Sequence, residues 1–441
     1  ILMADKKKMT VVQLTIITAV NMMGSGIIML PSKLAQVGTM SVISWLVTLT
    51  GALCLAYVFA RCGMFTKNTK DGMGGYAQYA FGMDGNMMAN YTYAFSLVIA
   101  NTAIAVSTVG YGEMVFGITL SPVKVAIATM IVLAIATVAN FWGARVTGQL
   151  GSLTVWGVII PVLFLCVGGW FWFHGHTYVN SWNPHHYSFF KGVSDSIPIT
   201  LWAFLGLESA SANSDSVENP KKNVPIAVIG GTVIAGIIYI ISTNIVQGIV
   251  KNEALANSNA PFGTVFTQMF NSTVGAIVMA LLTISCFGSL PAWQFTVAEV
   301  FRSSAIAGYF PKIFRQRTKH DAPVAGMIII LVVQLLLSLM TISPDLNAQF
   351  NNLVNLAVVT NMVPYILSMA SVKTLQLSAG ISSDNKNYKI TNALAVIAGV
   401  YSLYSMYACG NLSLALGALV AFAGWTIYGF VANKYNVTIN E

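Results

Sequence analysis

Charged residues are scarce in this sequence. Asp, Glu, Lys and Arg together make up only 8% of its 441 residues, whereas 56% are hydrophobic and the mean hydropathy is +0.71. Because soluble domains are typically about 25% charged, this composition excludes an ordinary soluble protein and predicts an integral membrane protein. Apolar stretches recur from near residue 12 to near residue 432. We therefore expect residues 1–441 to form one transmembrane domain in contact with the lipid bilayer.

Metal-binding and redox-active patterns are also missing. The cysteines are scattered, mostly within apolar stretches, and no two form a CxxC pair: Cys54, Cys62, Cys166, Cys286 and Cys409. This spacing excludes a disulfide framework and a zinc signature. One polar loop holds four histidines, without an acid or cysteine at a metal-binding spacing: His174, His176, His185 and His186. We expect no metal, no cofactor and no enzymatic activity; a membrane enzyme would need this loop as its site.

The positive charges fall mainly on one side of the expected membrane. The formal net charge is +8, but the basic residues lie in short loops between apolar stretches, which argues against a nucleic-acid partner. If the N-terminus is cytoplasmic, all 22 Lys and Arg residues lie on the cytoplasmic side except four: Lys33, Lys124, Lys191 and Lys251. The positive-inside rule then predicts that both termini are cytoplasmic and that the number of spans is even.

Windows of about 20 apolar residues predict twelve transmembrane helices, in agreement with the charge pattern. Their approximate ranges are 12–37, 40–62, 86–118, 122–142, 147–173, 189–214, 225–250, 272–303, 324–343, 348–371, 392–409 and 411–432. Between the second and third spans, residues 71–78 are rich in glycine. We expect this segment to be a cytoplasmic loop.

Glu208 is an acid within the apolar sixth span, with Gly206 just before it and Ser209 just after it. An ionisable group at membrane depth is costly and usually functional, so we predict that Glu208 faces a cavity and binds a cation or a cationic ligand. A proton could neutralise it as well, which makes it a candidate for proton coupling. The alternative is a hydrogen-bonded carboxyl that packs between helices.

The first span carries a similar interruption. Residues 21–27 read Asn-Met-Met-Gly-Ser-Gly-Ile, and glycines weaken a helix and expose backbone groups that must find partners. Small residues also permit close helix packing, so this motif alone leaves both interpretations open. The interpretation as a binding site is favoured because the sixth span, five spans later, carries a second interruption of this kind. This spacing is typical of inverted-repeat transporters that bind substrate at the midplane, and it predicts five-helix repeats over 12–173 and 189–371, followed by two extra helices over 392–432.

Four segments carry a resemblance to a known family: NMMGSGIIMLP (21–31), LWAFLGLES (201–209), ENPKKNVPIA (218–227) and SLPAWQ (289–294). They resemble the basic amino acid/polyamine antiporters of the amino acid–polyamine–organocation superfamily, nearest to members that exchange putrescine and ornithine. The similarity extends over nearly the whole chain. It implies an all-α, twelve-helix fold of the LeuT type with broken helices 1 and 6, and exchange of a cationic amino acid for its decarboxylation product.

The resemblance also implies a substrate site. The matching residues are, in chain order, Asn21, Ser25, Gly26, Ile27, Tyr93, Asn101, Trp202, Glu208, Trp293 and Tyr428. In the family, the break in the first span receives the α-carboxylate and α-amino groups, Trp202 matches the aromatic that closes over substrate from outside, and Glu208 matches the membrane glutamate. A carboxylate–ammonium pair at 4 Å is worth about 4 kcal/mol at an effective dielectric of about 20, before desolvation. For Tyr428, substrate contact and packing both remain open.

We therefore expect a multi-pass antiporter of the bacterial inner membrane that takes up ornithine and exports putrescine by alternating access. The alternatives are exchange of another pair, such as lysine and cadaverine, and proton-coupled symport of a polyamine or an amino acid. Gln78 and Asn436 depart from the family pattern, which has glutamate at both positions, and these replacements could weaken capture of a dication. Lateral contacts through the last two spans would permit a homodimer.

Overall fold

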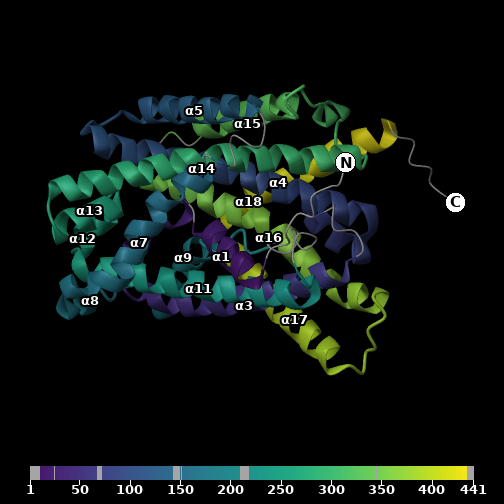
Figure 1. Ribbon diagram of the computed structural model, residues 1–441, viewed down its shortest axis with the longest axis horizontal. Helices are drawn as coiled ribbons and strands as arrows, with labels where there is room; N and C mark the ends of the chain where they lie inside the picture. Colours follow the sequence, from purple (N-terminus) through teal and green to yellow (C-terminus); the bar gives the residue numbers. More distant parts are fainter. Residues whose placement is uncertain are drawn as a thin grey trace, which may run out of the picture.

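The computed structural model describes residues 10–23, 25–66, 72–142, 149, 151–208, 218–340, 342 and 346–434. Within these ranges the regular secondary structure is entirely helical, as expected. The long helices run broadly along the longest axis of the molecule, with α1, α9 and α16 near the centre of the view (Figure 1). Helices α5 and α15 lie along one edge, and α3, α11 and α17 lie towards the opposite edge.

The α-helices are, in chain order, α1 (Val11–Met22), α2 (Leu30–Val37), α3 (Ser41–Phe65), α4 (Gly72–Phe116), α5 (Pro122–Ala139), α7 (Trp156–Gly168), α8 (Gly175–Asn180), α9 (Phe189–Trp202), α11 (Pro220–Ile249), α12 (Asn252–Ala256), α13 (Pro261–Met269), α14 (Ser272–Ile306), α15 (Val324–Met340), α16 (Leu346–Ser378), α17 (Lys386–Ala408) and α18 (Asn411–Lys434). Short 3₁₀ helices occur at η1 (Ser25–Ile27), η3 (Asn140–Trp142), η4 (Gly169–Trp172) and η6 (Lys312–Arg315).

Nine helices of the described part are long and apolar enough to cross a membrane: Ser41–Phe65, Gly72–Phe116, Pro122–Trp142, Gly151–Trp172, Lys222–Ile249, Ser272–Ile306, Ala348–Ser378, Lys386–Ala408 and Asn411–Val431. Two further apolar helices, Val11–Met22 and Val324–Leu339, are shorter. The chain is therefore a multi-pass membrane protein. The twelve-span topology, the two repeats and the LeuT-type arrangement stay predictions.

The first predicted span breaks where its glycines are. Helix α1 ends at Met22, η1 follows, and α2 begins at Leu30. A break of this kind leaves carbonyl groups without an intrahelical partner, and the Tyr111 hydroxyl from α4 donates a hydrogen bond of 3.0 Å to the Ile28 carbonyl. The buried phenol thus supplies one of the partners that exposed backbone needs in an apolar environment.

The sixth predicted span also ends early. Helix α9 ends at Trp202, and residues 203–208 continue as turns rather than as helix. Gly206 adopts φ = 103°, a conformation that glycine reaches far more easily than residues with a side chain. Residues 209–217 lie outside the described part.

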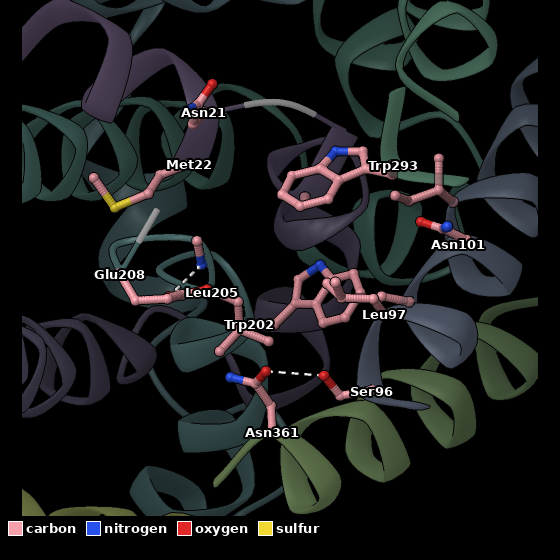
Figure 2. Close-up of a pocket in the computed structure, with 14 residues that line it drawn as sticks. Asn21, Met22, Ser96, Leu97, Asn101, Trp202, Leu205, Glu208, Trp293 and Asn361 are labelled. Atoms are coloured by element: carbon pink, nitrogen blue, oxygen red, sulfur yellow. Dashed lines mark hydrogen bonds between the residues drawn. The ribbon is translucent and has the colours of Figure 1, made fainter. Parts of the chain in front are cut away.

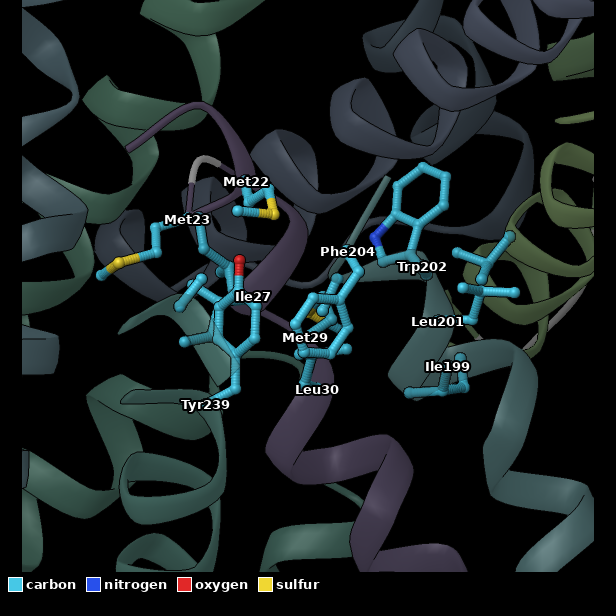
Figure 3. Close-up of a cluster of buried hydrophobic side chains, with 14 of the residues drawn as sticks. Met22, Met23, Ile27, Met29, Leu30, Ile199, Leu201, Trp202, Phe204 and Tyr239 are labelled. Carbon is cyan, nitrogen blue, oxygen red and sulfur yellow. The ribbon is translucent and has the colours of Figure 1, made fainter. Parts of the chain in front are cut away.

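Aromatic packing anchors this turn in the core. The Phe204 ring makes edge contacts with Trp45 of α3 and Tyr239 of α11, at centroid distances of 6.1 and 5.5 Å. Trp45 and Tyr239 stack on each other at 5.6 Å. Figure 3 shows Ile27 and Leu30 from the first interruption in the same buried cluster as Phe204 and Tyr239. One apolar core therefore holds both interruptions.

The prediction of a loop over residues 71–78 is wrong, because the chain is helical from Gly72 onward. Helix α4 begins there, bends at Gly82 (φ 62°, ψ −152°) and continues to Phe116. Glycine-rich sequence has a low helix propensity, but tertiary packing commonly overrides propensity. Here Tyr76 is buried and packs against the Phe59 ring at 6.3 Å, so burial of this face stabilises the helical conformation.

Two asparagines beyond the bend hold this glycine-rich turn. The Gly74 amide donates to Asn90 Oδ1 over 3.0 Å, and the Asn86 amide group donates to Gln78 Oε1 over 2.9 Å. A Cβ atom on Gly74 would lie 2.3 Å from Asn86 Oδ1, so only glycine permits this approach. Gln78 therefore has a local hydrogen-bonding role; Asn436 lies outside the described residues.

Candidate functional site

A cavity of about 60 Å³ lies between the two interrupted segments (Figure 2). The residues around it come from α1, η1, α4, α9 and its following turn, α14 and α16: Asn21, Met22, Gly26, Ser96, Leu97, Ala100, Asn101, Ile104, Trp202, Leu205, Gly206, Glu208, Trp293 and Asn361. Apolar side chains and indole rings form most of the wall. Polar groups converge at a few points, which is the usual construction of a site for a small molecule.

Glu208 is the acid of this cavity, and its side chain is held by three donors. The Tyr93 hydroxyl donates to Oε1 over 2.8 Å, and the Tyr365 hydroxyl donates to Oε2 over 2.5 Å. The Gly206 amide donates to Oε2 over 3.2 Å. These bonds come from α4, α16 and the turn after α9. The carboxyl group therefore ties together three segments that are distant in sequence.

No positive charge accompanies this carboxyl group among the described residues. The ion pairs found there join Lys191 to Asp195, and Glu299 and Asp321 to nearby arginines; none includes Glu208. Only 6% of Glu208 is exposed. Burial makes an uncompensated carboxylate expensive, and the tyrosine and glycine donors supply hydrogen bonds without supplying charge. The cavity is consequently suited to a ligand that brings a cation.

Two indole rings lie beside the carboxyl group. Figure 2 shows Trp202 and Trp293 between the Glu208 side and the Asn101 side of the cavity. A Cβ atom on Gly26 would lie 3.5 Å from Trp202 Nε1, so that indole faces the break in the first span. Trp202 Nε1 is buried and has no hydrogen-bond partner in the described part of the chain. Indole faces attract ammonium groups by about 0.5–2 kcal/mol, and the free N–H can donate to a carboxylate.

Trp202 also contacts the end of another helix. Its ring meets Phe350, in the first turns of α16, edge to face at 6.3 Å. The Lys33 ammonium group of α2 lies 5.7 Å from the centre of the same Phe350 ring. Phe350 and Lys33 are both buried. The Trp202–Phe350 contact thus packs an indole of the cavity wall against the first turns of α16, whereas the Glu208–Tyr365 bond lies further along α16.

Asn101 and Asn361 place amide groups at the cavity. Asn101 Nδ2 donates to Gln294 Oε1 over 3.0 Å, while Asn101 Oδ1 is buried without a partner among the described residues. On α16, Asn361 Oδ1 accepts a hydrogen bond of 2.9 Å from Ser96, and its Nδ2 has no partner in that part of the chain. The cavity therefore presents hydrogen-bonding groups that a bound molecule can satisfy.

The structure gathers most of the residues singled out from the sequence. Those that line the cavity are Asn21, Gly26, Asn101, Trp202, Glu208 and Trp293. Tyr93 reaches the site through its bond to Glu208. Ile27 is fully buried in the adjoining core, and the Ser25 side chain lies outside the described part. Tyr428 packs against Tyr309 and Trp425 instead, and does not line this cavity.

Four polar or aromatic residues at or beside the cavity were not identified from the sequence: Ser96, Phe350, Asn361 and Tyr365. The last three belong to α16, where tyrosine, phenylalanine and asparagine are unremarkable in a partly apolar helix. Pro364, inside α16, was the one local signal, because a proline frees a backbone carbonyl and often marks a functional bend.

The loop histidines are distributed along the surface. His176 Nδ1 accepts a hydrogen bond of 3.1 Å from the Asn180 side-chain NH₂ group, and His185 packs against Tyr187. Within the described ranges, no three His, Cys, Asp or Glu side chains gather closely enough to hold a metal ion.

A family model described as amino acid permease matches residues 9–431, which is nearly the whole chain. The chain belongs to the amino acid permease family. Among curated relatives, this permease is 60% identical to the putrescine transporter PotE of Escherichia coli (strain K12) over 434 residues, which cover 98% of each chain. It is 59% identical to the putrescine transporter PotE of Haemophilus influenzae over 434 residues, covering 98% of this permease and 99% of the relative.

A more distant relative is named for a different pair of substrates. The cadaverine/lysine antiporter of Escherichia coli (strain K12) is 32% identical over 375 residues, which cover 83% of each chain. The resemblance to an amine and amino acid transport family is confirmed by these matches. This permease is a transporter and not an enzyme, as expected.

Proposed function

We propose that this permease exchanges putrescine for ornithine across the bacterial inner membrane by alternating access, with both termini in the cytoplasm. Putrescine is a dication at neutral pH, and ornithine carries one net positive charge. The observation that carries the proposal is Glu208, a buried carboxyl group that lines the cavity and has no cationic partner among the described residues. A bound ammonium group supplies the missing charge.

The second end of the substrate meets a different set of groups. Asn101 Oδ1 is free of protein partners in the described part of the chain and lies across the cavity from Glu208 (Figure 2). It accepts a hydrogen bond from the second ammonium group. The indoles of Trp202 and Trp293 enclose the methylene chain between the two ends and attract the ammonium groups.

Ornithine differs from putrescine by its α-carboxylate. The break at Gly26 lies at the cavity wall, where backbone amides at the start of a helical segment favour a negative group. Trp202 Nε1, which faces Gly26, adds a donor. Glu208 then holds an ammonium group of either substrate, and the break distinguishes ornithine from putrescine.

Two closing contacts on α16 suit alternating access. Phe350 meets Trp202 near the start of the helix, and Tyr365 meets Glu208 further along it; at 1.5 Å per residue the two positions are roughly 22 Å apart along the axis. With cytoplasmic termini, the Phe350 contact faces outward and the Tyr365 contact faces inward. Each opens in turn, and substrate competes with Tyr93 and Tyr365 for the Glu208 oxygens.

The test is uptake of labelled putrescine into proteoliposomes that contain ornithine, lysine, arginine or buffer alone, for wild type and for Glu208→Gln. The proposal expects uptake that requires internal ornithine and is lost in the variant. Equal uptake into empty vesicles under an inward proton gradient would replace exchange with proton-coupled symport. A requirement for internal lysine, with labelled cadaverine preferred to putrescine, would assign the pair named for the more distant relative.

A further inference from the structure

Asn101 belongs to a network of buried side chains whose other members have no role in the proposed function. It joins Asn101 of α4, Gln294 of α14 and Gln334 of α15, with Thr137 of α5 at its side. All four side chains are at most 2% exposed. Buried polar groups in an apolar environment are energetically costly unless they are paired. In this network, donor and acceptor can be assigned in each hydrogen bond.

Two acceptors at the far end determine this assignment. The Gln334 amide group donates to the Val98 carbonyl over 3.2 Å, and a backbone carbonyl can only accept. The Gln294 amide group donates to Thr137 Oγ1 over 3.2 Å. The single Thr137 hydroxyl proton is already given to the Leu133 carbonyl over 2.8 Å, so Thr137 can only accept from Gln294. Each glutamine is thus forced to turn its NH₂ group towards its own anchor.

The two glutamines also lock each other. Gln294 Nε2 donates to Gln334 Oε1 over 2.6 Å, and Gln334 Nε2 donates to Gln294 Oε1 over 3.0 Å. If either amide group were reversed, acceptors would face acceptors in this pair and at its anchor. The orientation of Gln294 Oε1 is therefore determined from both sides, and that oxygen also accepts from Asn101 Nδ2 over 3.0 Å.

The consequence appears at the cavity. Because Asn101 must turn its NH₂ group towards Gln294, its oxygen is the atom left over, and Oδ1 is buried without a partner among the described residues. Asn101 is 1% exposed and lines the cavity; Figure 2 shows its oxygen on the side of Trp293. An unlocked asparagine could present either its NH₂ group or its oxygen to a ligand.

We propose that Gln294 and Gln334 are positioning residues, which hold the Asn101 oxygen towards the cavity so that this end of the site accepts a hydrogen bond from an ammonium group. The inference rests on the proposed function, since it assigns the second ammonium group of a diamine to Asn101. It makes the preference for a diamine over a monoamine depend on residues that do not touch the substrate.

The test compares binding of 1,4-diaminobutane and 1-aminobutane to the purified full-length protein by isothermal titration calorimetry. The quantity measured is the ratio of the two dissociation constants. In Gln294→Met the Asn101 amide group can turn, and we expect the preference for the diamine to fall about tenfold, the size of one hydrogen bond to a charged group, with monoamine affinity unchanged. Gln334→Met removes the Val98 anchor and reduces the preference in the same direction.

Two further variants separate positioning from loss of stability. In an Asn101→Leu background, Gln294→Met causes no additional loss, because the oxygen it orients is gone. Gln247→Met removes a glutamine that is 2% exposed on α11, outside this network, and leaves the ratio at its wild-type value.

Several results would overturn the inference. The inference is wrong if Gln294→Met and Gln334→Met both prefer the diamine as strongly as the wild type does. It is also wrong if these variants lose equal affinity for the diamine and the monoamine. An additional loss in the Asn101→Leu background would also exclude positioning through Asn101. If the wild-type protein binds neither amine, the proposed function itself is wrong. If it prefers the diamine but this preference does not change when Gln294 or Gln334 is substituted, only the inference is wrong.

Discussion

The hydroxyl of Tyr365 donates a hydrogen bond of 2.5 Å to Oε2 of Glu208, which joins the middle of α16 to the turn after α9. The same carboxyl group lines the cavity. A substrate ammonium group that approaches Glu208 therefore meets an oxygen that already holds a helix in place. In the proposed function, this shared acceptor couples ligand binding to the Tyr365 contact.

The first prediction concerns that coupling. Tyr365→Phe removes the hydroxyl and keeps the ring, and we expect it to lower the free energy of unfolding by about 1.5–3 kcal/mol, the range for hydrogen bonds to charged groups. Part of that loss disappears when Glu208 is already Gln, since a neutral amide is a weaker acceptor. Chemical denaturation in mixed micelles of the two single variants and the double variant measures the interaction energy.

Tyr239→Phe is the matched control for this cycle. Tyr239 is fully buried, and its hydroxyl has no partner in the described part of the chain. We expect its removal to show no interaction energy with Glu208→Gln. An interaction energy near zero for Tyr365 as well would mean that the short contact to Glu208 does not stabilise the protein.

The second prediction concerns the indole of Trp293. Trp293→Leu removes the aromatic face at the cavity, and we expect putrescine affinity to fall between about 2-fold and 30-fold, the range that corresponds to 0.5–2 kcal/mol for a cation–π contact. Trp293→Phe retains a smaller aromatic face and loses less. Trp182→Leu, at a position that is 43% exposed, is the control and keeps wild-type affinity. If Leu and Phe at position 293 bind equally well, Trp293 serves only as a packing residue.

The third prediction concerns Gly206 in the turn before Glu208. Its φ of 103° is strained for any residue with a side chain, so Gly206→Ala should destabilise the protein by about 1–3 kcal/mol. The turn also aims the Gly206 amide at Glu208 Oε2, so putrescine affinity should fall with the melting temperature. Thermal unfolding in detergent and binding calorimetry measure the two effects.

Gly112→Ala provides the comparison for that substitution. Gly112 lies within α4, and a Cβ atom there would meet nothing within 4 Å. Alanine in a helix is favoured over glycine by about 0.5–1 kcal/mol, so the melting temperature should stay the same or rise. If Gly206→Ala has the same melting temperature as Gly112→Ala, the turn before Glu208 accommodates a side chain without loss of stability.

The fourth prediction concerns the Trp202–Phe350 contact. Phe350→Ala leaves a void beside the Trp202 indole and removes the aromatic face over which Lys33 lies. We expect efflux of labelled putrescine from loaded proteoliposomes to become less dependent on external ornithine, because the contact that closes this side is weakened. Phe350→Tyr keeps the ring and the dependence. If putrescine efflux by Phe350→Ala still requires external ornithine, other residues must close this side of the cavity.

Sequence reasoning found the groups that are costly or conformationally unusual. Glu208 is detectable because an acid at membrane depth is rare, and the breaks are detectable because their glycines interrupt apolar runs. The resemblance added Trp202, Trp293 and Asn101, all of which line the cavity. These residues stand out from their surroundings in the sequence.

The missed residues have no such contrast. Tyr365 and Phe350 resemble ordinary packing residues until the fold places them beside Glu208 and Trp202. The helical 72–78 segment was missed for the converse reason, since its glycines favour a loop locally while contacts with Asn86 and Asn90 hold a helix. Tertiary contacts decide these cases, and they are not visible in the order of residues.

The measurement that tests the central claim most directly is putrescine binding to purified Glu208→Gln by isothermal titration calorimetry, beside wild type and Glu113→Gln. Glu208→Gln preserves shape and removes the charge, and we expect at least a tenfold loss of affinity from the ion-pair energy expected at this burial. Glu113, which accepts a hydrogen bond from the Leu120 amide at the end of α4, lies outside the cavity, so Glu113→Gln should bind as wild type does. Wild-type affinity in Glu208→Gln would contradict the account, because the buried carboxyl group would then have a structural role alone.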